Sequence, residues 1–127
     1  MCGLEYLHSK QIIHQNIRPD NILVAPTSNS AQFKLSDIGS RKESLSVWMA
    51  PETLEMVFDD IDLQSLPTSA SSAASDVWSL GCVFFYFLQK GQHPFAGDNM
   101  VRTLNNIIDG DPTQLSGTSL HLLAVYC

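Results

Sequence analysis

The run VWSLGCVFFYFL, residues 77–88, is the longest apolar stretch of the chain and limits its fold more than any other feature. At about twelve residues it is shorter than the roughly 20 that a membrane span needs, so no membrane segment is predicted. Ser75 before it and Gly91 after it are typical helix-ending residues, and we expect one helix over residues 76–90. A helix that is apolar on all sides has to be surrounded by protein. The chain is therefore predicted to fold around one central helix.

Composition and charge exclude several classes of protein. The 127 residues form at most one small domain, and a net charge of −6 opposes binding to a phosphate backbone, so no nucleic-acid partner is expected. Cys2, Cys82 and Cys127 are odd in number and far apart, without a C-x-x-C pair or a metal-ligand spacing. No signal-peptide pattern is present. These features predict a cytoplasmic chain with reduced thiols, or one on the cytosolic side of a membrane-anchored parent.

Shorter segments around the central helix alternate between helical and strand-like patterns. Helices are predicted for GLEYLHSK (residues 3–10), for the run that begins at Pro51, and for MVRTLNNIIDG (residues 100–110). Strand-like segments are QIIH (residues 11–14), NILVA (residues 21–25) and QFKLSD (residues 32–37). Helices and short strands together predict an α+β fold.

Two segments show no regular period. Residues 57–75 are acidic and then rich in Ser and Ala, which predicts an exposed loop. Residues 111–127 stop inside the apolar run LHLLAVYC, without a cap or a polar finish. We interpret this stretch as a truncated or atypical tail.

The segment HQNIRPDN, residues 14–21, concentrates hydrogen-bonding side chains between two apolar runs. A polar loop held between buried segments is a common place for catalytic groups. Its residue types therefore decide which chemistry the chain can support.

Four motifs, in order, resemble the C-terminal lobe of the eukaryotic protein kinases. The catalytic-loop pattern H-R-D-L-x-x-x-N occurs as HQNIRPDN, D-F-G as DIG (residues 37–39), and A-P-E unchanged at residues 50–52. SDVWSLGCVFFYF resembles the central hydrophobic helix of the family with its leading aspartate. The resemblance covers about residues 3–110. It implies a partial, mostly helical kinase-like C-lobe over residues 1–110, incomplete, with short β-hairpins around the catalytic loop.

Three sequence segments point to one group within the protein kinases. GLEYLHS, WMAPE and SLGCVFFYFLQKGQHPF are most similar to the endoplasmic-reticulum unfolded-protein sensors, which join a Ser/Thr kinase to an endoribonuclease. This similarity implies a role in the unfolded protein response.

The loop departs from the kinase pattern at two positions. Asn16 stands where the family has the carboxylate that accepts the proton of the substrate hydroxyl, and an amide cannot take up a proton near neutral pH. General-base help of this kind contributes typically ~10²–10⁴ in rate. Gln15 replaces the arginine that reads a phosphate on the activation loop in the family. The resemblance therefore implies an impaired kinase.

Other positions of the pattern are retained. Asn21 and Asp37 match the two metal-binding residues of the family and offer oxygen atoms that suit Mg²⁺. Arg18 takes the place of the lysine beside the transferring phosphate, keeping the positive charge with a different shape. Handling of Mg²⁺ and ATP is thus partly preserved.

Several residues are assigned structural roles by the resemblance. His14 is expected to pack beneath Ile38 of the DIG motif, which ends at Gly39, and Asp76 to cap the central helix and hold the backbone of the catalytic loop. Glu52 is expected to be an ion-pair partner. Further residues are expected only at the surface or in packing: His8, His93, His121, Trp48 and Trp78.

The 127 residues contain no glycine-rich phosphate loop and no strand lysine of the V-A-I-K type. Mg²⁺ and ATP are therefore expected only in a complete two-lobed parent, and none for this chain alone. Expected partners are the first kinase lobe or other proteins, with self-association possible through exposed apolar surface. Three functions stay open: an impaired regulatory kinase-like domain, the C-lobe of a working Ser/Thr kinase, and a truncated product without function.

Overall fold

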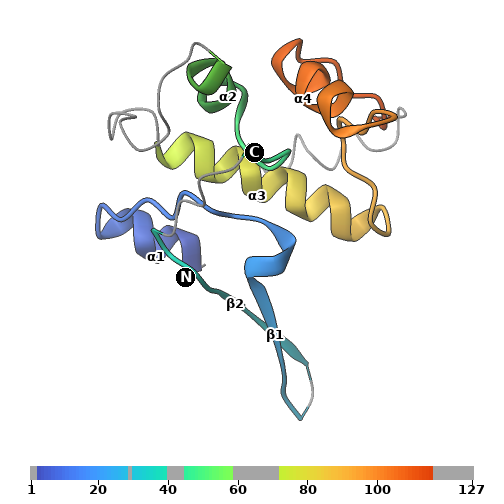
Figure 1. Cartoon of the computed structure of the whole chain (residues 1–127). Coiled ribbons are helices and arrows are strands. Elements are labelled where there is room, and N and C mark those ends of the chain that lie inside the picture. The colour runs from blue at the N-terminus through green and yellow to red at the C-terminus, as the bar shows by residue number, and fades with distance from the viewer. Residues whose placement is uncertain (1–2, 29, 40–44, 59–71, 116–127) are drawn as a thin grey trace.

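A computed structural model describes residues 3–28, 30–39, 45–58 and 72–115 (Figure 1). The elements in these ranges, in chain order, are α1 (Gly3–Ser9), a 3₁₀ turn η1 (Pro19–Asn21), strands β1 (Ile22–Pro26) and β2 (Ala31–Leu35), and helices α2 (Pro51–Phe58), α3 (Ala73–Leu88) and α4 (Met100–Ile108). The fold is α+β, as predicted, and agrees with a partial protein kinase fold.

The central helix α3 begins and ends earlier than the sequence predicted. Ser72, not Ser75, is its N-cap: the Ser72 hydroxyl accepts the Ser75 N–H at 3.2 Å, and the Ser75 hydroxyl accepts the Ser72 N–H at 3.0 Å. This reciprocal pair is a capping box, so Ser75 already lies inside the helix. At the other end Lys90 takes the left-handed conformation, with φ of 53°, and Gly91 N–H bonds back to Tyr86 C=O at 2.8 Å. This motif closes the helix at Leu88.

Helix α3 lies between two hydrophobic clusters (Figure 1). The loop-side core contains Leu4 of α1, Ile17 and Val83. The far-side core contains Leu54 of α2 with Leu104 and Ile107 of α4, and Trp78 of α3 packs against it. The helix is therefore central, as its apolar composition predicted.

A third side of α3 is not covered. Val77, Phe84 and Leu88 recur at i, i+7 and i+11 and are all exposed. The helix is thus enclosed on two sides only, and the expectation of exposed apolar surface is confirmed for this stripe.

Strands β1 and β2 form an antiparallel hairpin that extends away from the helices (Figure 1). Ile22 pairs with Leu35 at its base and Pro26 with Ala31 near its tip. The prediction of a strand over residues 11–14 is wrong. Gln11 is left-handed, with φ of 59°, Ile12 N–H bonds to Leu7 C=O, and this segment runs as irregular backbone instead of joining the hairpin.

Some predictions lie outside the described residues. These concern most of the loop at 57–75, most of the tail at 111–127, and the residues Cys2, His121 and Cys127. Cys82 is a buried residue of α3. Within the described ranges, no helix is long and apolar enough to span a membrane.

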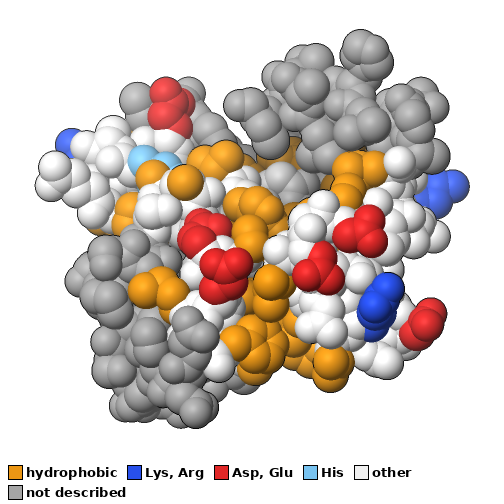
Figure 2. All heavy atoms as spheres, turned by 90° about the horizontal axis from the view of Figure 1, so that it is seen from above, with side chains coloured by type: hydrophobic (Ala, Val, Ile, Leu, Met, Phe, Trp, Pro, Cys, Tyr) orange, Lys and Arg blue, Asp and Glu red, His pale blue; other side chains and the backbone are white. Residues whose placement is uncertain are grey.

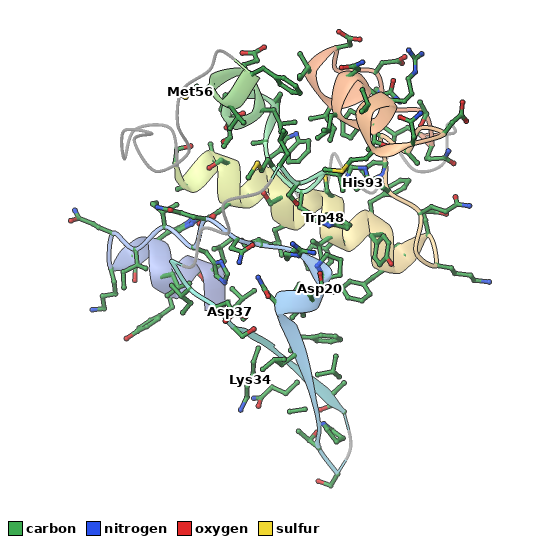
Figure 3. All side chains as sticks on the ribbon, in the orientation of Figure 1. Asp20, Lys34, Asp37, Trp48, Met56 and His93 are labelled. Atoms are coloured by element: carbon green, nitrogen blue, oxygen red, sulfur yellow. The ribbon has the colours of Figure 1, made fainter. Side chains whose placement is uncertain are left out.

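His93 is a buried packing residue of an aromatic cluster. Its ring lies 4.9 Å from the Trp48 ring, edge to face (Figure 3), and its Nδ1 accepts the Phe95 N–H at 3.2 Å. Burial lowers the pKa of His93 from 6.5 to about 4, and the backbone of Val47 opposes only part of this effect. The fold therefore prefers the neutral ring.

This preference predicts a pH dependence of stability. The unfolded chain takes up the proton near pH 6.5 and the folded chain near pH 4, so the contribution of His93 is complete above pH 6.5 and falls as pH drops toward 4. Because a tenfold change in proton affinity equals about 1.4 kcal/mol, the free energy of unfolding should fall by up to about 3 kcal/mol. Urea unfolding at several pH values should show this slope in the native chain. His93→Asn keeps an acceptor for Phe95 and should flatten it; equal slopes in both proteins would contradict the assignment.

Candidate functional site

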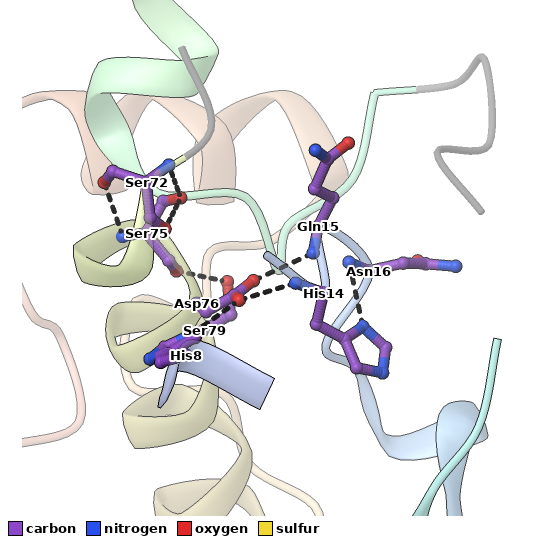
Figure 4. Close-up of polar contacts among 8 residues, drawn as sticks. All are labelled: His8, His14, Gln15, Asn16, Ser72, Ser75, Asp76 and Ser79. Atoms are coloured by element: carbon purple, nitrogen blue, oxygen red, sulfur yellow. Dashed lines mark hydrogen bonds and ion pairs between the residues drawn. The ribbon is translucent and has the colours of Figure 1, made fainter. Parts of the chain in front are cut away.

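The polar loop is anchored to α3 by Asp76. The Asp76 side chain is 2% exposed, and its two oxygens accept the His14 N–H at 2.7 Å and the Gln15 N–H at 2.9 Å (Figure 4). Asp76 shares a helix face with Leu80 and Val83, at i+4 and i+7, and this face packs on the loop-side core. The amphipathic spacing of α3 thus aims one carboxylate at the loop backbone. Asp76 does not cap α3, because Ser72 does.

His8 is a further partner of this carboxylate. Its Nε2 lies 2.9 Å from Asp76 Oδ2, from the last turn of α1 (Figure 4). Sequence reasoning placed His8 only at the surface or in packing, because its partner lies 68 residues away and no local pattern marks the pair. Helix α1, the loop and α3 therefore converge on one buried anion.

The anchor also holds an unfavourable backbone conformation. Gln15 has φ of 67°, in the left-handed region that costs a non-glycine residue about 1–2 kcal/mol. Its N–H is bound by Asp76, while its side chain is directed away from that carboxylate (Figure 4). The charge-assisted bond offsets the strain and fixes the direction of the loop.

His14 joins the loop to the DIG motif. Its ring is fully buried, and its Nδ1 accepts the Asn16 N–H at 3.3 Å, which assigns the ring proton to Nε2. The His14 carbonyl accepts the Gly39 N–H at 3.0 Å, where Gly39 is left-handed with φ of 71°. Ile38 is half-exposed and lines an apolar groove against α3.

Asn16 and Asn21 are brought together at the base of the hairpin. The Asn21 side-chain NH₂ donates to the Asn16 carbonyl at 2.8 Å, and Asn21 is nearly fully buried. This bond orients the Asn21 amide, so its oxygen is the group left to accept or to bind a metal. The Asn16 Nδ2 is buried and has no hydrogen-bond partner in the part of the chain that the structure describes.

The hairpin register brings Asp37 to the same end. Ser36 N–H bonds to Asn21 C=O at 2.9 Å, in continuation of the Ile22–Leu35 pair, and Asp37 follows directly. Asp37 is exposed and left-handed, with φ of 56°, just beyond β2 (Figure 3). The two predicted metal-binding residues therefore share one end of one hairpin.

These two oxygen donors fit Mg²⁺ as a partial set. Magnesium keeps several waters and is usually bound through one or two carboxylates plus substrate phosphates. Among the described residues no group of three His, Cys, Asp or Glu side chains could hold a metal by itself. The donors present suit a magnesium–nucleotide complex better than a bare ion.

Arg18 is partly buried, and Glu52 is exposed. Two nitrogens of the Arg18 guanidinium contact the same oxygen of Asp20: Nε lies 2.8 Å and Nη2 lies 2.6 Å from Asp20 Oδ2. A phosphate at this point would have to replace Asp20 as its partner. Glu52 lies in the first turn of α2, facing solvent.

The catalytic loop is anchored on the central helix and is followed in the chain by the hairpin and then by the DIG turn. Together these features define the C-lobe of a protein kinase. The profile of the protein kinase domain family matches residues 1–121. The chain belongs to the protein kinase family.

Individual relatives are Ser/Thr kinases, and two of them also carry an endoribonuclease. The chain is 38% identical to the human serine/threonine-protein kinase/endoribonuclease IRE2 over 88% of its own length, and 31% identical to the kinase/endoribonuclease ireA of Aspergillus fumigatus over 87%. It is 39% identical to myosin light chain kinase 3 of Danio rerio over 84%. It spans only 13%, 13% and 14% of these three proteins, respectively.

If Asp76 anchors the loop, replacing one of its carboxylate oxygens by an NH₂ group should lower the stability of the fold strongly. Asp76→Asn keeps the shape but sets an NH₂ group against a backbone N–H, so the free energy of unfolding should fall by roughly 2–4 kcal/mol. Urea unfolding followed by tryptophan fluorescence measures the change. Asp20→Asn removes a carboxylate from an exposed ion pair instead and should cost at most about 1 kcal/mol. Similar losses in the two variants would show that Asp76 does not anchor the loop.

Proposed function

We propose that this chain contributes a catalytically impaired Ser/Thr kinase-like C-lobe that acts in its parent protein by binding and regulation. The observation that carries the proposal is Asn16, which stands at the position of the proton-accepting carboxylate within an otherwise well-ordered loop. The backbone around it keeps its anchor on Asp76. The loss therefore concerns one functional group and leaves the scaffold in place.

The chemistry of Asn16 supports orientation without proton transfer. An amide can donate to or accept from a substrate hydroxyl, but it does not become protonated near neutral pH. Its Nδ2 is buried without a partner among the described residues, so a substrate hydroxyl could accept from it only after the surrounding residues move. A substrate would be held, and the proton would have to leave by water. This loss lowers the rate by typically ~10²–10⁴.

Control by phosphorylation of the activation segment is also weakened in this proposal. Gln15 has no charge with which to read a phosphate, and its backbone N–H is already bound to Asp76. Regulation would instead come through contacts with protein partners, of which the first kinase lobe is one.

Magnesium and ATP belong to the complete two-lobed parent. There the Asn21 oxygen and the Asp37 carboxylate would hold the metal, and Arg18 would face the phosphates in exchange for Asp20. Bound Mg²⁺ would neutralise the charge that develops on the transferring phosphoryl group. The residues of this chain would bind and orient the complex without supplying a base.

The cellular setting follows from the relatives and from the cysteines. Similarity to two kinase/endoribonucleases supports a parent protein in the unfolded protein response. The three cysteines are odd in number and lie far apart in the sequence, which supports a reducing compartment, either the cytoplasm or the cytosolic side of a membrane-anchored parent.

A working kinase is the second candidate. Retention of Asn21, Asp37 and Arg18, together with the intact Asp76 anchor, favours it. In that case Asn16 would position the hydroxyl well enough for transfer without a base. The two candidates differ in what a restored carboxylate would do.

One substitution separates them. The chain is fused to the C-terminus of a protein kinase first lobe that carries the glycine-rich loop and the strand lysine. Phosphoryl transfer from Mg·ATP is then measured for the native fusion protein and for its Asn16→Asp variant. The carboxylate should raise the rate by ~10²–10⁴. Nucleotide affinity should stay the same, because residue 16 addresses the hydroxyl and not the phosphates.

Two controls define the result. Asn16→Ala should not rise above the native level, and Asp37→Ala added to Asn16→Asp should abolish transfer. If the native protein is already as fast as the aspartate variant, the impaired-kinase proposal fails and the working kinase takes its place.

A further inference from the structure

The catalytic loop carries one arginine, and a carboxylate of the same loop neutralises it. Between residues 11 and 33, Arg18 is the one Lys or Arg residue and Asp20 is the one carboxylate. Nε and Nη2 of Arg18 both contact Asp20 Oδ2, at 2.8 Å and 2.6 Å. These two nitrogens form an edge of the guanidinium that can also bind a phosphate through two parallel hydrogen bonds. Asp20 therefore occupies a phosphate-binding edge of Arg18.

The turn η1 holds the two side chains within reach of each other. Arg18 precedes the turn with extended backbone, φ of −158° and ψ of 161°, and the ring of Pro19 fixes the next φ angle. The Asn21 N–H bonds to the Arg18 carbonyl at 3.0 Å and closes the turn around Asp20. Because the backbone already brings residues 18 and 20 together, the ion pair loses less side-chain entropy than a pair between distant surface residues.

The overall charge of the chain repels a phosphate. The net charge is −6, and the view from above shows acidic side chains spread over the face of α2 and α4 (Figure 2). The exposed carboxylates of these helices and of the segments beside α4 are Glu52, Glu55, Asp98, Asp109 and Asp111. At the loop, Asp20 and Asp37 both lie at the end of the hairpin nearer α3 (Figure 3). Attraction of an anion to the loop therefore depends on Arg18.

We propose that Asp20 is an internal competitor for phosphate at Arg18 and lowers the affinity of the site for Mg·ATP. The inference rests on the proposed function, in which Arg18 faces the phosphates of the nucleotide. Phosphate binding has to break the Arg18–Asp20 pair, so only the fraction of molecules with a free Arg18 is ready to bind. The loop thus regulates its own uptake of nucleotide.

The exposure of the pair sets the size of the effect. The Arg18 side chain is 29% exposed and the Asp20 side chain is 69% exposed, so this is a surface ion pair. Such pairs shift an equilibrium by up to about fivefold. Asp20→Asn keeps the shape and removes the charge, and it should therefore tighten phosphate binding by about two- to fivefold.

The complete 127-residue chain tests the competition without a nucleotide pocket. Pyrophosphate is added at constant ionic strength, and the NMR signals of the arginine Nε–H groups are followed. The Arg18 signal should respond at a concentration about two- to fivefold lower in Asp20→Asn than in the native chain. The Arg102 signal is the internal control. This exposed arginine of α4 has no carboxylate partner in the part of the chain that the structure describes, and it should respond equally in both proteins.

A double-mutant cycle in the two-lobed fusion protein tests the same competition with Mg·ATP. Asp20→Asn should lower the dissociation constant by about two- to fivefold when Arg18 is present and leave it unchanged in an Arg18→Met background. Asp98→Asn removes an exposed carboxylate from the segment before α4 and should change neither background. Calorimetric titration measures each constant and requires no phosphoryl transfer, so its result is separate from the test of the impaired kinase.

Three results would overturn the proposal. The first is an Arg18 signal that responds to pyrophosphate at the same concentration in both proteins, and the second is one that does not respond even in Asp20→Asn. The third is equal tightening of Mg·ATP binding by Asp20→Asn with Arg18 and with Arg18→Met, which would show plain repulsion between Asp20 and the phosphates. A fusion protein that binds no Mg·ATP would contradict the nucleotide part of the proposed function, and the pyrophosphate titration would then decide the competition alone.

Discussion

The buried carboxylate of Asp76 is the interaction on which the rest of the structure depends. It accepts two backbone N–H groups of the loop and contacts a histidine of α1, so three separate segments meet at one charge. A buried charge is stable only when its hydrogen bonds are complete. The loop is thus locked in place, including the left-handed Gln15, because releasing it would leave the buried carboxylate with His8 as its one remaining partner among the contacts described.

This anchoring separates the scaffold of the site from its chemistry. The bonds that shape the loop run through backbone groups of His14, Gln15 and Asn16 and through the Asn21 amide. They do not require a carboxylate at residue 16. A kinase loop can therefore lose its base and keep its form, and the same anchored lobe remains able to present binding surfaces.

Local pattern was sufficient for most of the fold. The apolar run predicted α3, Pro51 marked the start of α2, and the β-branched runs predicted the hairpin, because each depends on neighbours in the chain. Residues 11–14 have the same β-branched character but find no strand partner, and their backbone bonds to α1 and α3 instead. The pairing of His8 with Asp76 and the capping box at Ser72 also went unpredicted, since the first spans 68 residues and in the second two equivalent serines compete. For the site, the kinase resemblance gave the positions of Asn21 and Asp37, but only the register of β1 and β2 shows that they share one end of the hairpin.

Hydrogen exchange at the loop amides tests the central claim most directly. If Asp76 holds the loop, the His14 and Gln15 amides exchange only when the whole fold opens, as slowly as the amide of Val83 in the middle of α3. Exchange of these two amides at the rate of an exposed residue such as Asp20, while Val83 stays protected, would contradict the account. The loop would then be only loosely attached to the central helix.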